Sequence, residues 1–141
     1  MSYPILKPGN TWFTPTVSTV TRGTITSINL ANTYTPADTV TDSWDASISQ
    51  DGSITVYVEG TKLTISGNGS GKIAANENAS YMLAEFGSVT SINGLNILDT
   101  SNTVDMSYMF FKSYGLLSID VSSFNVSKVK TMEYMFGANT N

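Results

Sequence analysis

The sequence contains no cysteine and no histidine. Without cysteine the chain cannot form disulfides, thiolate metal sites or a nucleophilic thiol. Without histidine it cannot build a histidine-dependent triad or a Cys/His zinc site. We therefore expect no catalytic residues, no metal site and no cofactor.

Charge is also scarce. Seven lysines and arginines stand against eleven aspartates and glutamates, which gives a net charge of −4, and Arg22 is the single arginine. Nucleic-acid binding requires clustered cations that displace counterions from phosphates. The sequence has no such cluster, so we do not expect nucleic acid as a partner.

Long hydrophobic runs are absent as well. No apolar stretch approaches the roughly 20 residues that a transmembrane helix needs. The first nine residues, MSYPILKPG, lack the basic start and apolar stretch of a signal peptide. We therefore expect neither membrane insertion nor an export leader within this sequence.

Short neutral polar residues take the place of the missing charges. The chain holds 19 Thr, 19 Ser and 12 Asn among 141 residues, while 40% of the residues are hydrophobic. These polar side chains favour strands, turns and caps over long helices. The apolar content is too high for a disordered chain. The composition predicts a mainly β fold with short helices.

Residues 1–43 are expected to form an N-terminal arm and anchor segment, with one or two strands among residues 16–30. Pro4, Pro8 and Pro15 favour an extended start. The arm is nevertheless too apolar for a solvated tail, so its side chains either fold back onto the chain's own core or dock onto another subunit or protein. The candidate anchor and assembly residues are Tyr3, Pro4, Ile5, Leu6, Trp12 and Phe13.

Residues 44–79 are expected to form an antiparallel β meander that caps the following part. Apolar residues alternate with polar ones over 44–48, 54–58 and 63–65, and Gly52 and Gly60 mark the turns between these runs. Alternation between glycine-containing turns is typical of antiparallel strands with one buried face.

Residues 80–141 repeat themselves. The segment 98–110 aligns with 124–136 at an offset of 26 residues, and a weaker copy around Ser80-Tyr81-Met82 aligns at an offset of 27. A period in the twenties is typical of a solenoid, here about two and a half coils. The chain stops in the middle of a coil, so we expect either that the natural chain continues or that another molecule covers the last coil.

Each repeat is expected to contain a short helix followed by a short strand. Met106, Met109 and Phe110 fall at i, i+3 and i+4, which is one face of a helix. Leu117, Ile119 and Val121 alternate as in a strand. The expected repeat core comprises Met82, Met106, Met109, Phe110, Leu117, Ile119, Val121, Phe124, Met132, Met135 and Phe136.

Tyrosines recur beside this core. Tyr81, Tyr108 and Tyr134 occupy equivalent repeat positions, and Tyr114 lies between two of them. Aromatic side chains with a polar end suit binding surfaces. The four tyrosines are our candidate binding residues; the alternative is that they are amphipathic residues at the rim of the repeat core.

The strings VDMSYMF and LLSIDVSSFNVSKVKTMEYMF resemble the BspA-like leucine-rich repeats of bacterial surface proteins. The segment from Trp44 to Gly67 is similar to the β leader that often precedes such repeats. The resemblance implies a leucine-rich-repeat-like solenoid that acts in adhesion or binding rather than catalysis. One departure is Thr103-Val104, where the family places its apolar residue first.

An apolar N-terminal arm on adhesin-like repeats without an export signal favours a bacteriophage virion fibre, in the capsid or the tail. Its expected partners are other virion proteins or further copies of itself, with a trimer as one option, and a host-surface glycan or protein. The alternative is a bacterial cell-surface or secreted adhesin. A third class, a carbohydrate hydrolase, would draw its carboxylate pair from Asp99, Asp105, Asp120 and Glu133.

Overall fold

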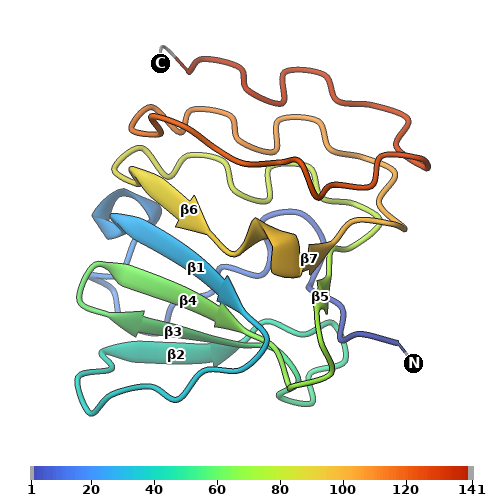
Figure 1. Cartoon of the computed structure of the whole chain (residues 1–141). Helices are drawn as coiled ribbons and strands as arrows, with labels where there is room; N and C mark the ends of the chain where they lie inside the picture. The colour runs from blue at the N-terminus through green and yellow to red at the C-terminus, as the bar shows by residue number, and fades with distance from the viewer. Residues whose placement is uncertain (1, 140–141) are drawn as a thin grey trace.

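The computed structural model describes residues 2–139 and is mainly β, with very short helices (Figure 1). The strands are β1 (Ser27–Ala31), β2 (Asp42–Asp45), β3 (Thr55–Glu59), β4 (Lys62–Ser66), β5 (Ile73–Ala74), β6 (Ser91–Asn93) and β7 (Leu98–Asp99). Two 3₁₀ helices are present, η1 (Arg22–Thr24) and η2 (Leu95–Ile97). None of the helices within residues 2–139 is long and apolar enough to cross a membrane.

The expected meander is present. Strands β2, β3 and β4 follow one another along the chain and pair antiparallel. In β3, Val56 and Val58 are fully buried and alternate with half-buried neighbours. This period of two gives the meander one face that packs on the core.

Strand β1 comes from the segment expected to be an anchor, and it lies inside the sheet. It pairs in parallel with β4 on one side and β6 on the other, which gives the strand order β2-β3-β4-β1-β6. The sheet is therefore mixed, and β1 joins the meander to the repeats. After β6 the chain passes very close to β1 at Gly94, where φ is +86°. A Cβ at this position would lie 2.0 Å from the Leu30 carbonyl oxygen.

The N-terminal arm packs against its own chain. Leu6 is 1% exposed and Trp12 is fully buried, and residues 5 and 6 form β-bridges to Ala74 and Ser47. For Leu6 and Trp12 the first of the two alternatives therefore holds: both side chains fill the core of their own chain and are not exposed for docking, although both were candidate anchor residues. Of the other candidate anchor residues, Tyr3, Pro4 and Phe13 are half-buried and Ile5 is 42% exposed.

An aromatic cluster fixes the arm in place. The Trp12 ring stacks on Phe86 at 6.1 Å between centroids, and Phe13 meets Trp44 edge-on at 5.4 Å. The Arg22 guanidinium lies 4.8 Å from the centroid of Phe13 and 5.1 Å from that of Phe86. Rings at such distances attract one another and attract a cation beyond simple area burial. The cluster joins arm, sheet and repeats.

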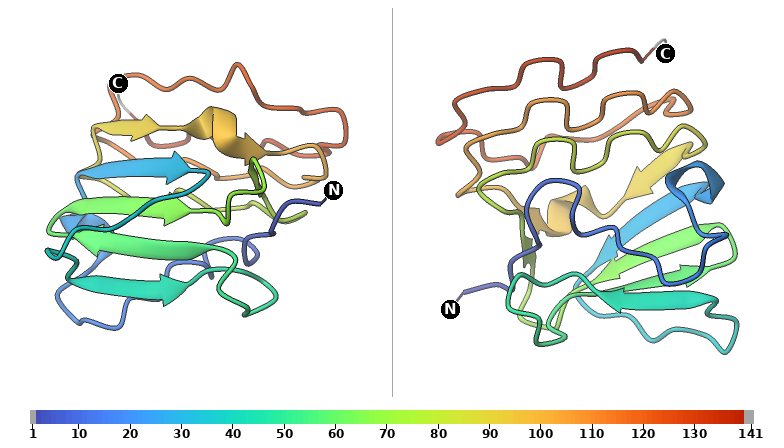
Figure 2. Two further views of the ribbon diagram at one scale, coloured as in Figure 1. Left: turned by 60° about the horizontal axis from the view of Figure 1, so that its bottom comes forward. Right: turned by 180° about the vertical axis from the view of Figure 1, so that it is seen from behind.

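The repeats form three zigzag segments that lie one above another at one end of the sheet (Figure 2). We call residues 77–86, 104–113 and 130–139 the first, second and third segment. The predicted helix at Met106, Met109 and Phe110 is wrong, because residues 107–112 form consecutive turns. The strand predicted for residues 117–121 is absent too, although β6 occupies the equivalent place one repeat earlier.

We predict that Trp12→Ala lowers the free energy of unfolding by about 3–5 kcal/mol, because it removes a fully buried ring and leaves a cavity. Val17→Ala, at a 37% exposed position of the same part of the chain, is the control and should change it by less than about 0.5 kcal/mol. Urea denaturation monitored by circular dichroism measures both. Equal effects of the two substitutions would contradict the buried position of Trp12.

Candidate binding face of the stacked segments

Each segment is a run of overlapping turns. In the second segment the Met109 N–H donates to the Met106 carbonyl and the Phe111 N–H to the Tyr108 carbonyl. The third segment repeats this pattern with Met135 to Met132 and Gly137 to Tyr134. Every second N–H is thus used inside a turn, which leaves the alternate N–H groups free to point out of the segment.

Those alternate N–H groups all point toward the next segment. Ala79, Tyr81, Leu83 and Glu85 donate to carbonyls of the second segment at distances of 2.7–3.2 Å. Met106, Tyr108, Phe110 and Lys112 donate in the same way to carbonyls of the third segment at 2.8–3.1 Å. Over these turns, one side of a segment therefore carries donors and the other side acceptors, unlike an ordinary β-strand, whose two edges each carry both. At the first residues of the segments the direction is reversed, because Val104 and Asp105 donate to the Glu77 carbonyl and Lys130 donates to the Val104 carbonyl.

A side-chain turn opens each segment. The Asn78 Oδ1 accepts hydrogen bonds from the Ser80 N–H and hydroxyl, and the Asp105 Oδ1 accepts the equivalent pair from Ser107. In the third segment Thr131 Oγ1 accepts from the Glu133 N–H. Such a turn fixes the backbone between the acceptor residue and the residue two positions later in the chain. It thereby positions the tyrosine that comes next.

The three equivalent tyrosines form a column, which we call the tyrosine ladder. Tyr81 and Tyr108 stack with centroids 4.7 Å apart and planes 6° apart, and Tyr108 and Tyr134 stack at 5.2 Å and 27°. Phe111 packs edge-on against Tyr108 at 5.1 Å. The backbone of all three tyrosines is left-handed, with φ of 54–60°. This conformation is uncommon for bulky residues and is set here by the turns and the stacking.

The ladder presents its two ends and its outer side to solvent. Tyr81 is 38% exposed and Tyr134 is 59% exposed, whereas Tyr108 between them is half-buried. Removal of water from its ring, followed by the proximity of Tyr81, Glu133 and Tyr134, raises the pKa of the Tyr108 hydroxyl above its ordinary value of 10.0. Tyr108, at the centre of the ladder, is therefore uncharged over the physiological pH range.

The other candidate binding tyrosine lies outside the ladder. Tyr114 follows the second segment and its ring lies beside Gly87, where a Cβ would approach it to 3.4 Å. It is 47% exposed. The structure brings Tyr81, Tyr108 and Tyr134 together and leaves Tyr114 apart.

The expected repeat core divides into buried and exposed residues. Met82, Met106, Met109, Phe110 and Met135 are buried, and Ile119, Val121 and Phe124 are half-buried against the core. Three residues differ from expectation: Leu117 is 76% exposed, Phe136 is 46% exposed and Met132 is 43% exposed.

These three corrections have physical reasons. At the corner after the second segment the neighbouring Leu116 is the buried residue, so the chain turns one position earlier than the alternation suggested. Met132 and Phe136 belong to the third segment, and no described residue covers its outer side. The Phe136 ring stacks on the buried Phe110 at 5.3 Å, so only its other face is open.

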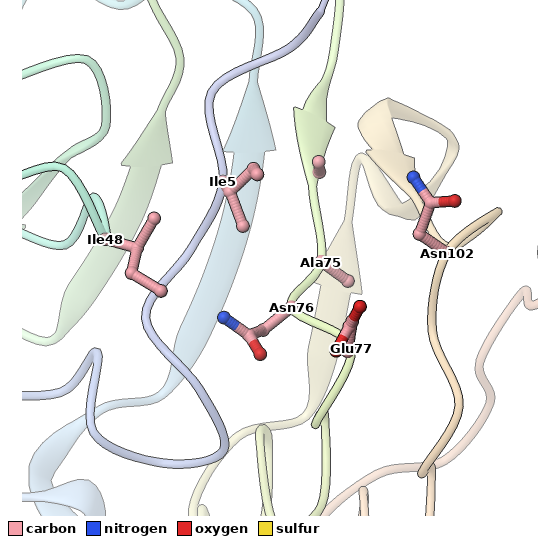
Figure 3. Close-up of a pocket in the computed structure, with 7 residues that line it drawn as sticks. Ile5, Ile48, Ala75, Asn76, Glu77 and Asn102 are labelled. Atoms are coloured by element: carbon pink, nitrogen blue, oxygen red, sulfur yellow. The ribbon is translucent and has the colours of Figure 1, made fainter.

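A shallow hollow of about 310 Å³ lies beside the arm (Figure 3). Ile5 and Ile48 line one side of it and Asn102 the other, with Asn76 and Glu77 between them. The carboxylates considered for hydrolysis do not gather here: Asp99 and Asp120 line two other hollows. No group of three or more metal-binding side chains occurs within residues 2–139.

Three arm residues have a role that the sequence did not reveal. The Gly9 N–H donates to the Asn78 carbonyl at 2.8 Å, and Trp12 Nε1 donates to the Met82 carbonyl at 2.8 Å. Arg22 Nη1 donates to the Ala84 carbonyl at 3.4 Å. These donors lie on the acceptor side of the first segment. The only hint in the sequence was that the single arginine falls within the apolar arm.

The tyrosine ladder lies within a region that is similar to a known family. Residues 75–141 match the family described as "Mycoplasma protein of unknown function, DUF285". The match is consistent with the resemblance to BspA-like surface proteins, and it begins directly after β5. Comparison with curated proteins and with solved structures gives no match.

We predict that Tyr108 ionises at higher pH than an ordinary tyrosine, because its pKa is raised in the folded chain. Its contribution to stability is complete below the unfolded pKa of about 10 and is lost as pH rises through the higher folded value. In Tyr108→Phe the alkaline loss of stability should become shallower. Urea midpoints measured from pH 8 to pH 11.5 test this, with Tyr57→Phe as the control. Identical pH profiles for wild type and Tyr108→Phe would contradict it.

Proposed function

We propose that the protein is a non-enzymatic attachment protein. In this proposal its stacked segments are coils of a short leucine-rich-repeat-like solenoid, and the tyrosine ladder is the contact surface. The expected partner is a host-surface glycan or protein. The observation that carries the proposal is the column of stacked, solvent-facing tyrosines at equivalent repeat positions.

The solenoid part is supported by the regularity of the stack. Hydrogen bonds from the turns join the first segment to the second at a sequence separation of 26 residues and the second to the third at 25, each one residue short of the repeat offset. Outside the segments two further bonds join the same coils: the Thr100 hydroxyl donates to the Asn125 carbonyl, and the Lys128 ammonium donates to Asn102 Oδ1. Such stacking buries each coil's apolar edge against the next coil.

The contact surface is supported by its chemistry. Tyrosine offers a large apolar face and a hydroxyl at little conformational entropy, which is why it is enriched at interfaces. The ladder holds its rings rigid through stacking worth about 0.5–1.5 kcal/mol per pair. A partner would therefore meet an ordered surface and would not need to order it on binding.

The non-enzymatic part is supported by the use of the acidic side chains. Asp99, Asp105 and Asp120 each accept a hydrogen bond from the main chain two residues later. This is the ordinary capping role of aspartate in a turn. None of the three faces another of them across a common hollow.

Two settings for this function follow from the sequence, a bacteriophage virion and a bacterial surface. The virion setting rested on an arm free to anchor the protein. In the structure the arm covers the first segment, so it does not favour a virion over a cell. The resemblance to BspA-like surface proteins favours the bacterial surface, which we adopt, with the virion as the alternative.

Binding of fluorescently labelled protein to a glycan array and to intact bacterial cells tests the contact surface. We expect Tyr134→Ala to weaken binding by about tenfold or more, since a central aromatic often contributes more than 1 kcal/mol. Ile48→Ala, at a similarly exposed position away from the ladder, is the control. Unchanged binding of Tyr134→Ala would contradict the proposed surface, and release of sugar from array glycans would contradict the non-enzymatic role.

Immunogold labelling separates the two settings. Antibodies raised against the purified chain should label the surface of intact cells of the producing bacterium. Label on phage particles released by lysis, with none on intact cells, would contradict the bacterial setting and establish the virion.

A further inference from the structure

The tyrosine ladder holds phenol rings against one another in pairs. The centroids of Tyr81 and Tyr108 are 4.7 Å apart, and those of Tyr108 and Tyr134 are 5.2 Å apart. The three residues occupy equivalent repeat positions, so their rings project from neighbouring segments in the same direction. The carbon atoms beside the hydroxyl of one ring therefore lie next to those of its neighbour. Two phenols are thus kept in contact by the fold alone.

The outer rings of the ladder are accessible to a reagent in solution. Tyr81 is 38% exposed and Tyr134 is 59% exposed, and Tyr108 between them contacts both. The pair of Tyr81 and Tyr108 joins the first segment to the second, so its geometry does not depend on any residue beyond the third segment. An oxidant can therefore reach the ladder from at least one side.

Other easily oxidised side chains are absent, covered or react differently. The chain has no cysteine, which an oxidant would attack first. Trp12 is fully buried and Trp44 is 8% exposed. The exposed thioether of Met132 takes up an oxygen atom when it is oxidised and does not couple to a second side chain. Tyrosines are therefore the accessible residues that can give up single electrons.

We propose that the tyrosine ladder is a site of oxidative cross-linking, in which Tyr108 becomes joined to Tyr81 or Tyr134 by a carbon–carbon bond. The co-reactant is hydrogen peroxide, which acts through a heme peroxidase. Each phenol loses one electron and one proton and becomes a phenoxyl radical. The two radicals couple at carbon atoms beside their oxygens, and the hydrogen on each of these carbons moves to the oxygen and restores the phenol. Two hydrogen atoms leave the pair, and one peroxide molecule becomes two water molecules.

Proximity favours coupling within the ladder over coupling between molecules. Groups held in contact react as if at a concentration far above that of any protein in solution. The planes of Tyr108 and Tyr134 are already inclined by 27° to each other. Exposed side chains also change rotamer quickly, which lets neighbouring rings turn their edges toward each other. The ladder therefore supplies both contact and the freedom that bond formation requires.

The cross-link would fasten one coil of the stack to the next. Tyr81 and Tyr108 are 27 residues apart and Tyr108 and Tyr134 are 26 apart, so either bond closes a loop of one repeat. A covalent closure of this kind stabilises a fold mainly by restricting the unfolded chain. Oxidation would thus strengthen the repeats, whether or not the ladder contacts a partner as in the proposed function.

Treatment of the dilute protein with a heme peroxidase and hydrogen peroxide tests the inference. Digestion after lysine and glutamate places Tyr81, Tyr108, Tyr114 and Tyr134 on separate peptides, because cleavage sites lie between each of them. Mass spectrometry of the purified monomer should find the Tyr108 peptide joined to the Tyr81 or the Tyr134 peptide, with the loss of two hydrogens.

Two variants that each lack one hydroxyl form a matched pair. Tyr108→Phe keeps a ring for stacking but cannot form a phenoxyl radical, and it leaves Tyr81 and Tyr134 two repeats apart. Dityrosine fluorescence of the oxidised monomer should fall at least about tenfold in this variant. Tyr114→Phe changes an exposed ring outside the ladder and should leave the fluorescence unchanged. The urea midpoint should rise on oxidation of the wild type and not of Tyr108→Phe.

A second pair of tyrosines provides the contrary outcome. The ring centroids of Tyr34 and Tyr57 are 5.9 Å apart with planes 44° apart, and the Tyr34 hydroxyl donates to Glu59. Cross-links confined to this pair or to dimers would overturn the inference, as would equal fluorescence from the wild type and Tyr108→Phe. None of these measurements uses a glycan or a cell, so failure of the proposed function and failure of this inference can be told apart.

Discussion

The direction of the hydrogen bonds between the stacked segments is the constraint on which the rest of the structure depends. Each segment uses half of its N–H groups in its own turns and sends the other half toward the next segment. The intersegment backbone bonds made by the turns therefore all run the same way, and only at the start of the segments do Val104, Asp105 and Lys130 donate back to the preceding segment. A stack of this kind has two chemically different ends, and a buried end must be satisfied because unpaired polar groups are costly.

The N-terminal arm satisfies one of these ends, and this explains features that otherwise look unrelated. Trp12 lies in the core although it is near the start of the chain, because its indole N–H reaches a carbonyl of the first segment. The only arginine packs over the rings of Phe13 and Phe86, where its guanidinium reaches another such carbonyl. Strand β1, which follows the arm, also connects to the repeats, because it pairs in parallel with β4 of the meander and with β6 of the repeat region.

The sequence predicted much of this fold and missed the rest for identifiable reasons. Alternation over three short runs gave the meander, and self-similarity gave the repeat and the equivalence of Tyr81, Tyr108 and Tyr134. The spacing of Met106, Met109 and Phe110 was read as a helix, but turns that overlap every two residues can bury residues at the same spacing. The left-handed backbone of the three tyrosines could not be predicted from the sequence, because that conformation is usually indicated by glycine or asparagine.

The role of the arm could not be read from composition either. An apolar segment with prolines is equally consistent with an anchor and with a cap. Only the positions of the Gly9, Trp12 and Arg22 donors, opposite carbonyls some 60 to 70 residues later in the chain, decide between them. Likewise, Leu116 and Leu117 are adjacent and chemically identical, and which one is buried depends on where the corner of the coil falls.

The central claim, that the turns of each segment donate their hydrogen bonds toward the following segment, is tested most directly by amide hydrogen exchange of the unmodified chain, followed by NMR. We predict that the amides of Tyr108, Phe110 and Lys112, which donate into the third segment, are strongly protected. Those of Tyr134, Phe136 and Ala138 should exchange at rates close to those of an unstructured chain. Equal protection of the two sets would contradict the claim.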